Sequence, residues 1–175
     1  TSGQAGAGQT DVQRPAEMNI PASEIAVRDF FDRHAAYYER SWDTLAHGLH
    51  VGIFDRGPGG SLESAYQRSR DHVENLLGWI APLGRDSHVL DVCCGSAATL
   101  DQLVAHSGGR GLGIDISEAQ LALATRLRSP ERLSLRQGSA SGLSEIVGDC
   151  APFTHAFSQE GLLFAHDKVA SVRGL

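Results

Sequence analysis

The chain has 175 residues, a length that suits one domain with a single working core. Its formal charge of -6 excludes electrostatic capture of nucleic acid or of an anionic membrane, because no basic face is available to release counterions. No run of about 18 apolar residues and no charged start followed by an apolar core is present, so we predict neither a membrane span nor a signal peptide and expect a cytoplasmic protein.

Residues 1–22 are rich in Gly, Gln, Ala and Pro and carry few large apolar side chains, a composition that predicts a flexible N-terminal arm. Ser23 is the predicted N-cap of a helix that runs to about Arg40 with an apolar face. Gly and Pro then interrupt helical spacing, and residues 23–60 are interpreted as a helical lid and loop. We interpret His47 and His50 as hydrogen-bonded loop histidines in preference to metal ligands.

Residues 61–175 alternate between helical and strand patterns. The predicted elements, in order, are a helix capped by Ser61 and ended by Pro82, a strand at His88–Val92, a helix at Leu100–His106, a strand at Leu112–Asp115, a helix whose Ser117 and Gln120 have capping-box spacing, and strands at Leu133–Gln137 and Phe153–Ser158. This order predicts an α/β fold with a Rossmann-like, doubly wound parallel sheet and right-handed crossovers.

The three cysteines are an odd number and two of them, Cys93 and Cys94, are adjacent. Adjacent cysteines suit neither a disulfide framework nor a zinc site, so we expect reduced thiols and no metal.

Ligands of open α/β sheets lie beyond the carboxyl ends of the strands. The candidates are therefore Asp91 to Ala97, Asp115 and Ile116, Gly138 to Ala140, and Ser158 to Glu160. The small side chains between Cys93 and Ala98 allow a ligand to approach the backbone closely, and Asp115 follows Gly95 by twenty residues, where a carboxylate can accept both ribose hydroxyls.

Two nucleoside classes compete for this site. A dinucleotide fold requires G-x-G-x-x-G to seat a pyrophosphate, whereas this turn offers Gly95 alone, with Cys93 and Ala98 at the other glycine positions. A ligand without phosphates demands less of the helix end, which favours S-adenosylmethionine over NAD.

The segments VLDVCCGSAAT and GLGIDISEAQ resemble the nucleoside-binding core of class I S-adenosylmethionine-dependent methyltransferases. YYERSW, HVGIFD and SQEGLLFAHDK are similar to small-molecule methyltransferases related to glycine/sarcosine and dimethylglycine N-methyltransferases. The resemblance covers roughly residues 30–168.

The resemblance implies a role for each matching position. For the nucleoside, Asp115 would hold the ribose, Ile116 would pack on adenine, and Ser139 and Ala140 would lie at the adenine edge. For the methionine part, Asp91, Cys93 and Gly95 would form the turn beneath it, and Ser158 and Gln159 would face the sulfonium and the acceptor. Tyr38 and Trp42 would belong to the lid. His166 and, second, Glu160 are candidate bases for an acceptor that must lose a proton, although a surface histidine is an equal interpretation of His166. The family usually has glycines at the positions of Cys93 and Ala97 and an acid at that of Ser139.

The resemblance implies seven strands, of which residues 61–175 supply four, so the sheet is expected to be truncated after the fourth strand and to leave that strand as an edge. Three explanations of the truncated sheet stay open. They are later residues outside the sequence, a second chain or a second copy that completes the sheet, and a remnant that acts through protein contacts. The expected partner is a small-molecule acceptor, and the expected activity is methyl transfer in specialised metabolism. A catalytically silent methyltransferase-like subunit and a non-methylating reaction such as cyclisation are the alternatives.

Overall fold

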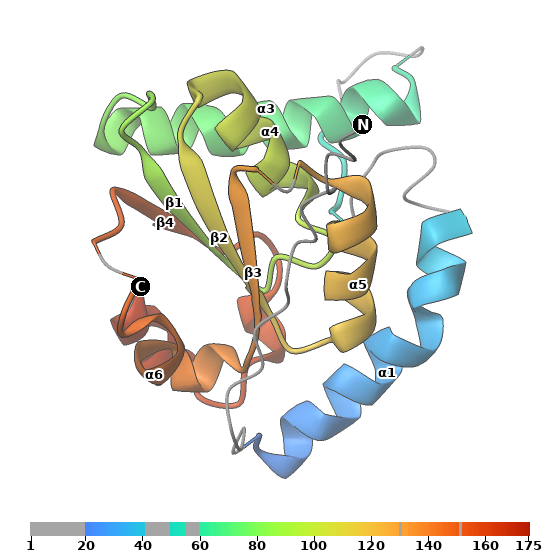
Figure 1. Ribbon diagram of the computed structural model, residues 1–175. Coiled ribbons are helices and arrows are strands. Elements are labelled where there is room, and N and C mark those ends of the chain that lie inside the picture. The colour runs from blue at the N-terminus through green and yellow to red at the C-terminus, as the bar shows by residue number, and fades with distance from the viewer. Residues whose placement is uncertain (1–19, 41–49, 55–59, 130, 151) are drawn as a thin grey trace, which may run out of the picture.

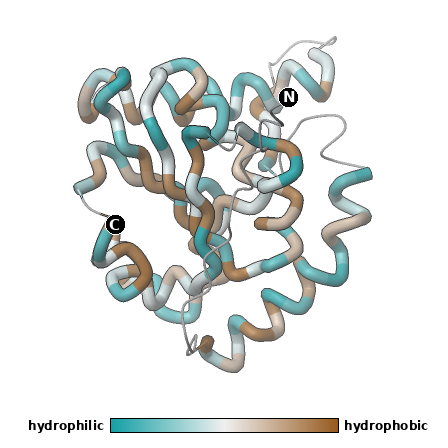
Figure 2. Tube along the Cα trace, in the orientation of Figure 1, coloured by the Kyte–Doolittle hydropathy of each residue, from teal (hydrophilic) through white to brown (hydrophobic). Residues whose placement is uncertain are grey.

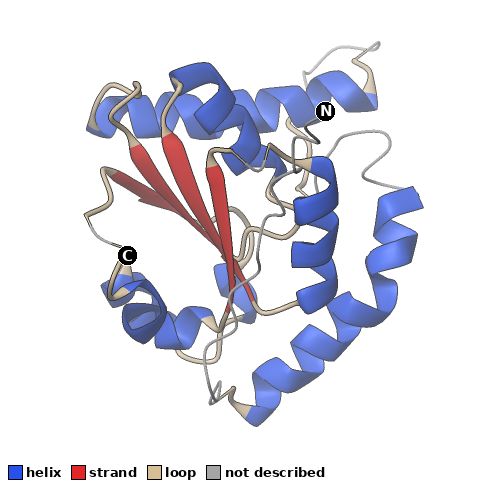
Figure 3. Cartoon of the chain, viewed as in Figure 1, coloured by secondary structure: helices blue, strands red, loops and turns tan. Residues whose placement is uncertain are grey.

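The fold was analysed in a computed structural model that describes residues 20–40, 50–54, 60–129, 131–150 and 152–175. Four strands form one parallel sheet in the order β3-β2-β1-β4, at the centre of the molecule (Figure 3). Their bounds are His88–Val92 for β1, Arg110–Asp115 for β2, Leu133–Gln137 for β3 and His155–Phe157 for β4. The Rossmann-like parallel sheet predicted from the alternating patterns is therefore confirmed.

Helices surround the sheet (Figure 1). The α-helices are α1 (Ala22–Tyr38), α3 (Leu62–Ile80), α4 (Ala98–Ser107), α5 (Glu118–Leu127), α6 (Leu143–Val147) and α7 (Lys168–Gly174), and two short 3-10 helices are η2 (Ala140–Gly142) and η3 (Leu162–Phe164). Within the described ranges, no helix combines the length and apolar character that a membrane crossing requires.

Each face of the sheet has its own hydrophobic core, because successive side chains of a strand point to opposite faces. On one face, Val89 packs with residues of α3, α4 and α5, including Leu100 and Leu121. On the other, Leu90 and Val92 pack with Leu143 and other residues that follow β3 and β4. Apolar residues accordingly gather along the strands and polar ones along the outer helices (Figure 2).

Several local predictions hold. β1 and β3 have the expected bounds, and the hydroxyls of Ser61 and Ser117 accept hydrogen bonds from the backbone N–H groups three residues later, as N-caps do. β4 is shorter than expected and lies at the sheet edge, paired with β1.

The prediction for Ser23 is wrong. Helix α1 begins at Ala22, and its N-cap is Pro21, which has no side chain able to cap. The carbonyl oxygen of Pro21 accepts the first hydrogen bonds of the helix, from Glu24 N at 2.9 Å and Ile25 N at 3.1 Å. Ser23 is left to bond elsewhere, and its Oγ lies 2.9 Å from Nδ1 of His166. Trp42, His47 and residues 1–19 of the predicted arm lie outside the described residues.

Candidate functional site

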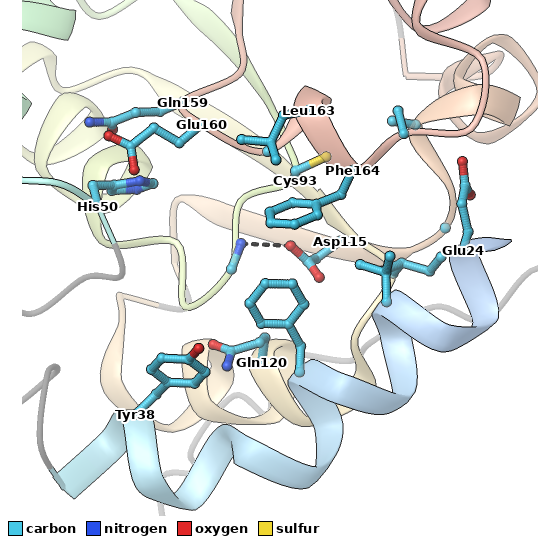
Figure 4. Close-up of a pocket in the computed structure, with 18 of the residues that line it drawn as sticks. Glu24, Tyr38, His50, Cys93, Asp115, Gln120, Gln159, Glu160, Leu163 and Phe164 are labelled. Atoms are coloured by element: carbon cyan, nitrogen blue, oxygen red, sulfur yellow. Dashed lines mark hydrogen bonds between the residues drawn. The ribbon is translucent and has the colours of Figure 1, made fainter.

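A cavity of about 340 Å³ lies beyond the carboxyl ends of the strands, where parallel sheets bind ligands. It is lined by residues from several separate parts of the chain (Figure 4). These are the helices α1 and α5, the segment around His50, the turns after β1, β2 and β3, and the loop after β4.

The turn after β1 forms one wall through an unusual backbone. Cys93, Gly95 and Ala97 have φ values of 64°, 53° and 56°, in the left-handed region. For a residue with a Cβ this conformation costs roughly 1–2 kcal/mol. The turn is nevertheless fixed by hydrogen bonds from Cys94 N to Ile114 O (3.0 Å) and from Ala97 N to Cys94 O (2.8 Å). Cys93 and Ala97 thus adopt the left-handed backbone conformation that glycine adopts more readily.

Asp115 is held at the cavity by two backbone donors. Gly95 N donates to Oδ2 at 2.8 Å and Ser117 N donates to Oδ1 at 2.9 Å. Burial raises the pKa of this carboxyl, and the bonds from Ser117 and Gly95 oppose that shift. Because each carboxylate oxygen has two acceptor positions, one on each oxygen is left for a ligand hydroxyl. The geometry therefore suits a vicinal diol.

The neighbouring titratable groups of the turn are shielded from solvent. Burial, and then the charge of Asp115, holds the pKa of Asp91 well above its usual range, and the same two causes raise the pKa of the Cys93 and Cys94 thiols. All three cysteines are free, and the two in the turn are kept as thiols. They supply a small apolar surface and no nucleophile.

Helix α1 forms the facing wall with Val27, Phe31 and Tyr38. Phe31 also meets Phe164 of η3 edge to face, with ring centroids 5.7 Å apart. Such aromatic pairs add to the stability that burial alone provides. The cavity is consequently apolar on this side.

Glu24 joins α1 to two loops that are far away in the sequence. Its carboxylate accepts a very short hydrogen bond from the hydroxyl of Ser139, one from Ser141 Oγ at 2.7 Å and one from His166 N at 2.7 Å. Glu24 is 3% exposed. A buried carboxylate with three donors is well satisfied, so it anchors α1 over the cavity.

The structure brings most of the sequence-predicted residues together at the cavity. Tyr38, Cys93, Gly95, Asp115, Ile116, Ala140, Gln159 and Glu160 line it. Asp91, Ser139 and Ser158 do not contribute to its lining, since Asp91 is buried behind the turn and Ser139 bonds to Glu24.

His166 does not line the cavity either. Its ring bonds to Ser23 Oγ and its side chain is exposed, as in the surface interpretation of this residue. Glu160 does line the cavity, but its carboxylate accepts the N–H of Val51 at 3.1 and 3.0 Å and so fixes the segment that carries His50.

Gln159 lines the cavity with its amide engaged at both ends. Its Oε1 accepts from Thr99 Oγ1 and its Nε2 donates to Ser69 Oγ, each at 2.9 Å. These bonds tie the loop after β4 to α3 and α4. The side chain therefore positions this loop.

Sequence reasoning missed several lining residues, including Glu24, His50, Gln120 and Phe164. Burial, followed by the charge of Arg70, lowers the pKa of His50 to about 4, so its imidazole is neutral near pH 7. His50 is the first residue of the segment HVGIFD, but nothing in the sequence indicates that it faces the cavity.

Fold and site together define a Rossmann-like α/β domain with a cavity beyond the carboxyl ends of its parallel strands. Residues 89–172 match a family described as a methyltransferase domain. With the solved structures below, this match confirms the resemblance of the chain to class I S-adenosylmethionine-dependent methyltransferases.

Three solved structures illustrate the likeness of fold. A protein assigned as a sarcosine dimethylglycine methyltransferase from Galdieria sulphuraria is 18% identical with a TM-score of 0.70 over 82% of this chain and 54% of its own. The [4+2]-cyclase SpnF is 20% identical with a TM-score of 0.71 over 91% of this chain and 57% of its own. Geranyl diphosphate C-methyltransferase from Streptomyces coelicolor A3(2), solved with S-adenosyl-L-homocysteine, is 19% identical with a TM-score of 0.57 over 73% and 51%.

The chain thus spans about half the length of these structures. No curated protein sequence matches it significantly.

Proposed function

We propose that this chain binds S-adenosylmethionine in the cavity and is the cofactor-binding part of a methyltransferase that acts on a small molecule. The observation that carries the proposal is Asp115, a buried carboxylate that lines the cavity and is fixed by Gly95 N and Ser117 N, each of which donates to a different oxygen. The matched family and the fold support the same choice.

The lining residues fit this cofactor. A ribose diol would donate to Asp115, the apolar side chains of Ile116 and Ala140 would contact the adenine, and the bare turn at Gly95 would admit the methionine part. When bound, the cofactor supplies a methyl group already activated by its positive sulfur. The protein then has to align the acceptor and exclude water.

On the acceptor side, the chain's own contribution is shape and exclusion of solvent. Phe31 and Phe164 form an apolar wall of the cavity. Gln159 fixes the loop after β4, and Glu160 fixes the segment that carries His50. A small-molecule acceptor, a role in specialised metabolism and a cytoplasmic location are parts of this proposal. So is assembly with a second chain or a second copy, since one solved relative of the fold is a complex with the methyltransferase activator Trm112.

Isothermal titration with S-adenosylhomocysteine tests the proposal. Asp115→Ala removes the carboxylate, and because a hydrogen bond to a charged group contributes roughly 1.5–3 kcal/mol, we expect the loss of two to weaken binding by at least about 100-fold. Asp101→Ala is the matched control, because Asp101 accepts a hydrogen bond from Ser129 N and does not line the cavity. A folded wild-type protein that takes up no S-adenosylhomocysteine, or an Asp115→Ala variant that binds like the wild type, contradicts the proposal.

A further inference from the structure

His50 places an imidazole ring at the wall of the cavity, on the side of the loop after β4 (Figure 4). Neither ring nitrogen makes a hydrogen bond to a residue that the structure describes. The sequence predicts a hydrogen-bonded loop histidine at this position, so within the described ranges the structure differs from that prediction. An imidazole that lines a cavity and keeps its nitrogens uncommitted can bind a ligand there.

The segment that carries His50 is held from two sides. The N–H of Val51 donates to both carboxylate oxygens of Glu160, at 3.1 and 3.0 Å. The N–H of Ile53 donates to the carbonyl oxygen of Ala65 on α3 at 2.9 Å. Glu160 has a φ of 61°, a left-handed conformation that residues with side chains keep mainly where the surrounding structure fixes them at a functional site. His50 is therefore positioned by its neighbours before a ligand binds.

The carboxylates that line the cavity are already committed to other contacts. Glu24 accepts three hydrogen bonds that anchor α1, and Asp115 accepts two from the backbone. Glu160 accepts the N–H of Val51. Protonation of any of them would remove acceptor positions that these contacts use. The Cys93 thiol keeps its proton, because burial and then the charge of Asp115 raise its pKa.

The imidazole of His50 has the protonation state that a proton acceptor requires. Burial, and then the charge of Arg70, lowers its pKa to about 4, so the ring is neutral near pH 7. One nitrogen of a neutral imidazole carries an N–H, and the other carries a lone pair that can accept a proton. The low pKa also favours release of that proton to water once the product has left.

We propose that His50 is a catalytic residue, the base that takes a proton from a hydroxyl or ammonium group of the methyl acceptor. The O–H or N–H bond of the acceptor breaks, and the proton moves to the lone pair of the imidazole. The freed electron pair of the acceptor forms the bond to the methyl carbon, and the electrons of the C–S bond remain on sulfur. One positive charge is lost at sulfur and one is gained at the imidazole, so the charges balance. This inference rests on the proposed function, because it names a residue of the same reaction and restricts the acceptor to a group that must lose a proton.

Sinefungin probes the place of the transferred methyl group without the acceptor, because it carries an ammonium group there in place of the methyl sulfonium. A neutral imidazole that faces this place accepts a hydrogen bond from the ammonium, and it has no such donor in S-adenosylhomocysteine. Calorimetry at pH 7 with both ligands gives the ratio of the two Kd values for wild type and His50→Leu. We expect wild type to favour sinefungin and His50→Leu to reduce this preference at least about tenfold, since a hydrogen bond to a charged group is lost.

Nitrogen NMR of the imidazole provides a second measurement, made on the unchanged protein. The signal of the nitrogen with the lone pair should shift towards that of a protonated nitrogen when sinefungin binds, and should not do so with S-adenosylhomocysteine. His50→Gln identifies the signal, because it removes this one ring. A residue that only packs against the ligand would respond to both ligands alike.

His106→Leu is the matched control. It makes the same substitution at a histidine whose Nδ1 lies 2.9 Å from Glu74 Oε2 and which does not line the cavity. The ratio of the two Kd values should equal that of the wild type.

The possible failures are distinguishable. If the wild type binds neither ligand, the proposed function and this inference both fall. If the wild type binds both and His50→Leu keeps the wild-type ratio, or if the His50 signal responds equally to both ligands, the inference alone is overturned. Because the NMR measurement uses the wild type, it decides the question even where His50→Leu does not fold.

Discussion

The turn Cys93–Ala97 and the helix α1 enclose the same cavity but are held in place by different forces. Cys94, Ser96 and Ala97 of the turn are buried, and the turn packs into both hydrophobic cores, since Cys94 and Ala97 belong to one and Cys93 packs against the other. In α1, Glu24 is the buried residue, and the helix is attached by the polar side chain of Glu24 as well as by the contact of Phe31 with Phe164. The turn is thus part of the core of the domain, whereas α1 packs on the outside of that core.

A second polar attachment of α1 shows the same principle. Asp32 Oδ1 accepts from Ser117 Oγ at 2.6 Å and from Ala119 N at 3.2 Å, at the start of α5. A carboxylate is favoured at a helix N-terminus, where backbone N–H groups are free. Because such attachments exchange readily with water, we expect α1 to open locally while the sheet stays folded.

The largest effect that separates the two walls is expected from Glu24→Ala. Removing the carboxylate leaves the hydroxyls of Ser139 and Ser141 and the N–H of His166 without their acceptor, at a cost of about 2 kcal/mol, or roughly 30-fold in the opening equilibrium of α1. Hydrogen exchange should accelerate in residues 22–38 and stay unchanged in β1.

Asp29→Ala is the control for this change, because Asp29 lies on the same helix and accepts its side-chain hydrogen bonds from Arg28. Equal exchange in the Glu24 and Asp29 variants, or equal acceleration in α1 and β1, would contradict the separate attachment of the two walls.

The next effect concerns pH. The folded pKa of His50 is about 4, against 6.5 for an ordinary histidine, so between these values the unfolded state binds more protons and stability falls as the pH falls. We expect His50→Gln to remove a slope of up to about 1.4 kcal/mol per pH unit in that window. The raised pKa values of Asp91 and Asp115 act with the opposite sign, but they are common to both proteins.

Denaturant unfolding from pH 4 to 8 provides this measurement. The difference in stability between wild type and His50→Gln should be constant above pH 7 and should change below it. A difference that stays constant across the whole range would mean that His50 is not shielded in the folded state.

The smallest effect is expected at the turn itself. Ala97→Gly relieves roughly 1–2 kcal/mol of left-handed strain and loses roughly 0.8 kcal/mol of methyl burial, so unfolding free energy should rise by about 0.5 kcal/mol. Ala98→Gly, at the first residue of α4, has no left-handed strain to relieve and should instead lower it by roughly 0.8 kcal/mol through lost methyl burial. Chemical denaturation compares the two, and equal destabilisation would contradict the strain at position 97.

The same contrast explains what the sequence could predict. The strands β1 and β3 and the position of Asp115 follow from local patterns, since buried strands have short apolar runs and Asp115 comes directly after one. The Glu24 contacts could not be predicted, because the residues they join lie more than 100 positions apart.

Tertiary contacts decide two further positions. Gln120 has the spacing of a capping box, and only the bond from Ser117 N to Asp115 shows that its side chain is not used there. His166 comes shortly after the residues that line the cavity, but η3 turns the chain so that its ring meets Ser23. In both cases a tertiary contact decides where a locally plausible side chain points.

A crystal structure of the protein with S-adenosylhomocysteine tests the central claim most directly. The account predicts the nucleoside in the cavity between the turn and α1, with the ribose diol within hydrogen-bond distance of the Asp115 carboxylate. A ligand outside this cavity, or one whose ribose faces away from Asp115, would contradict it.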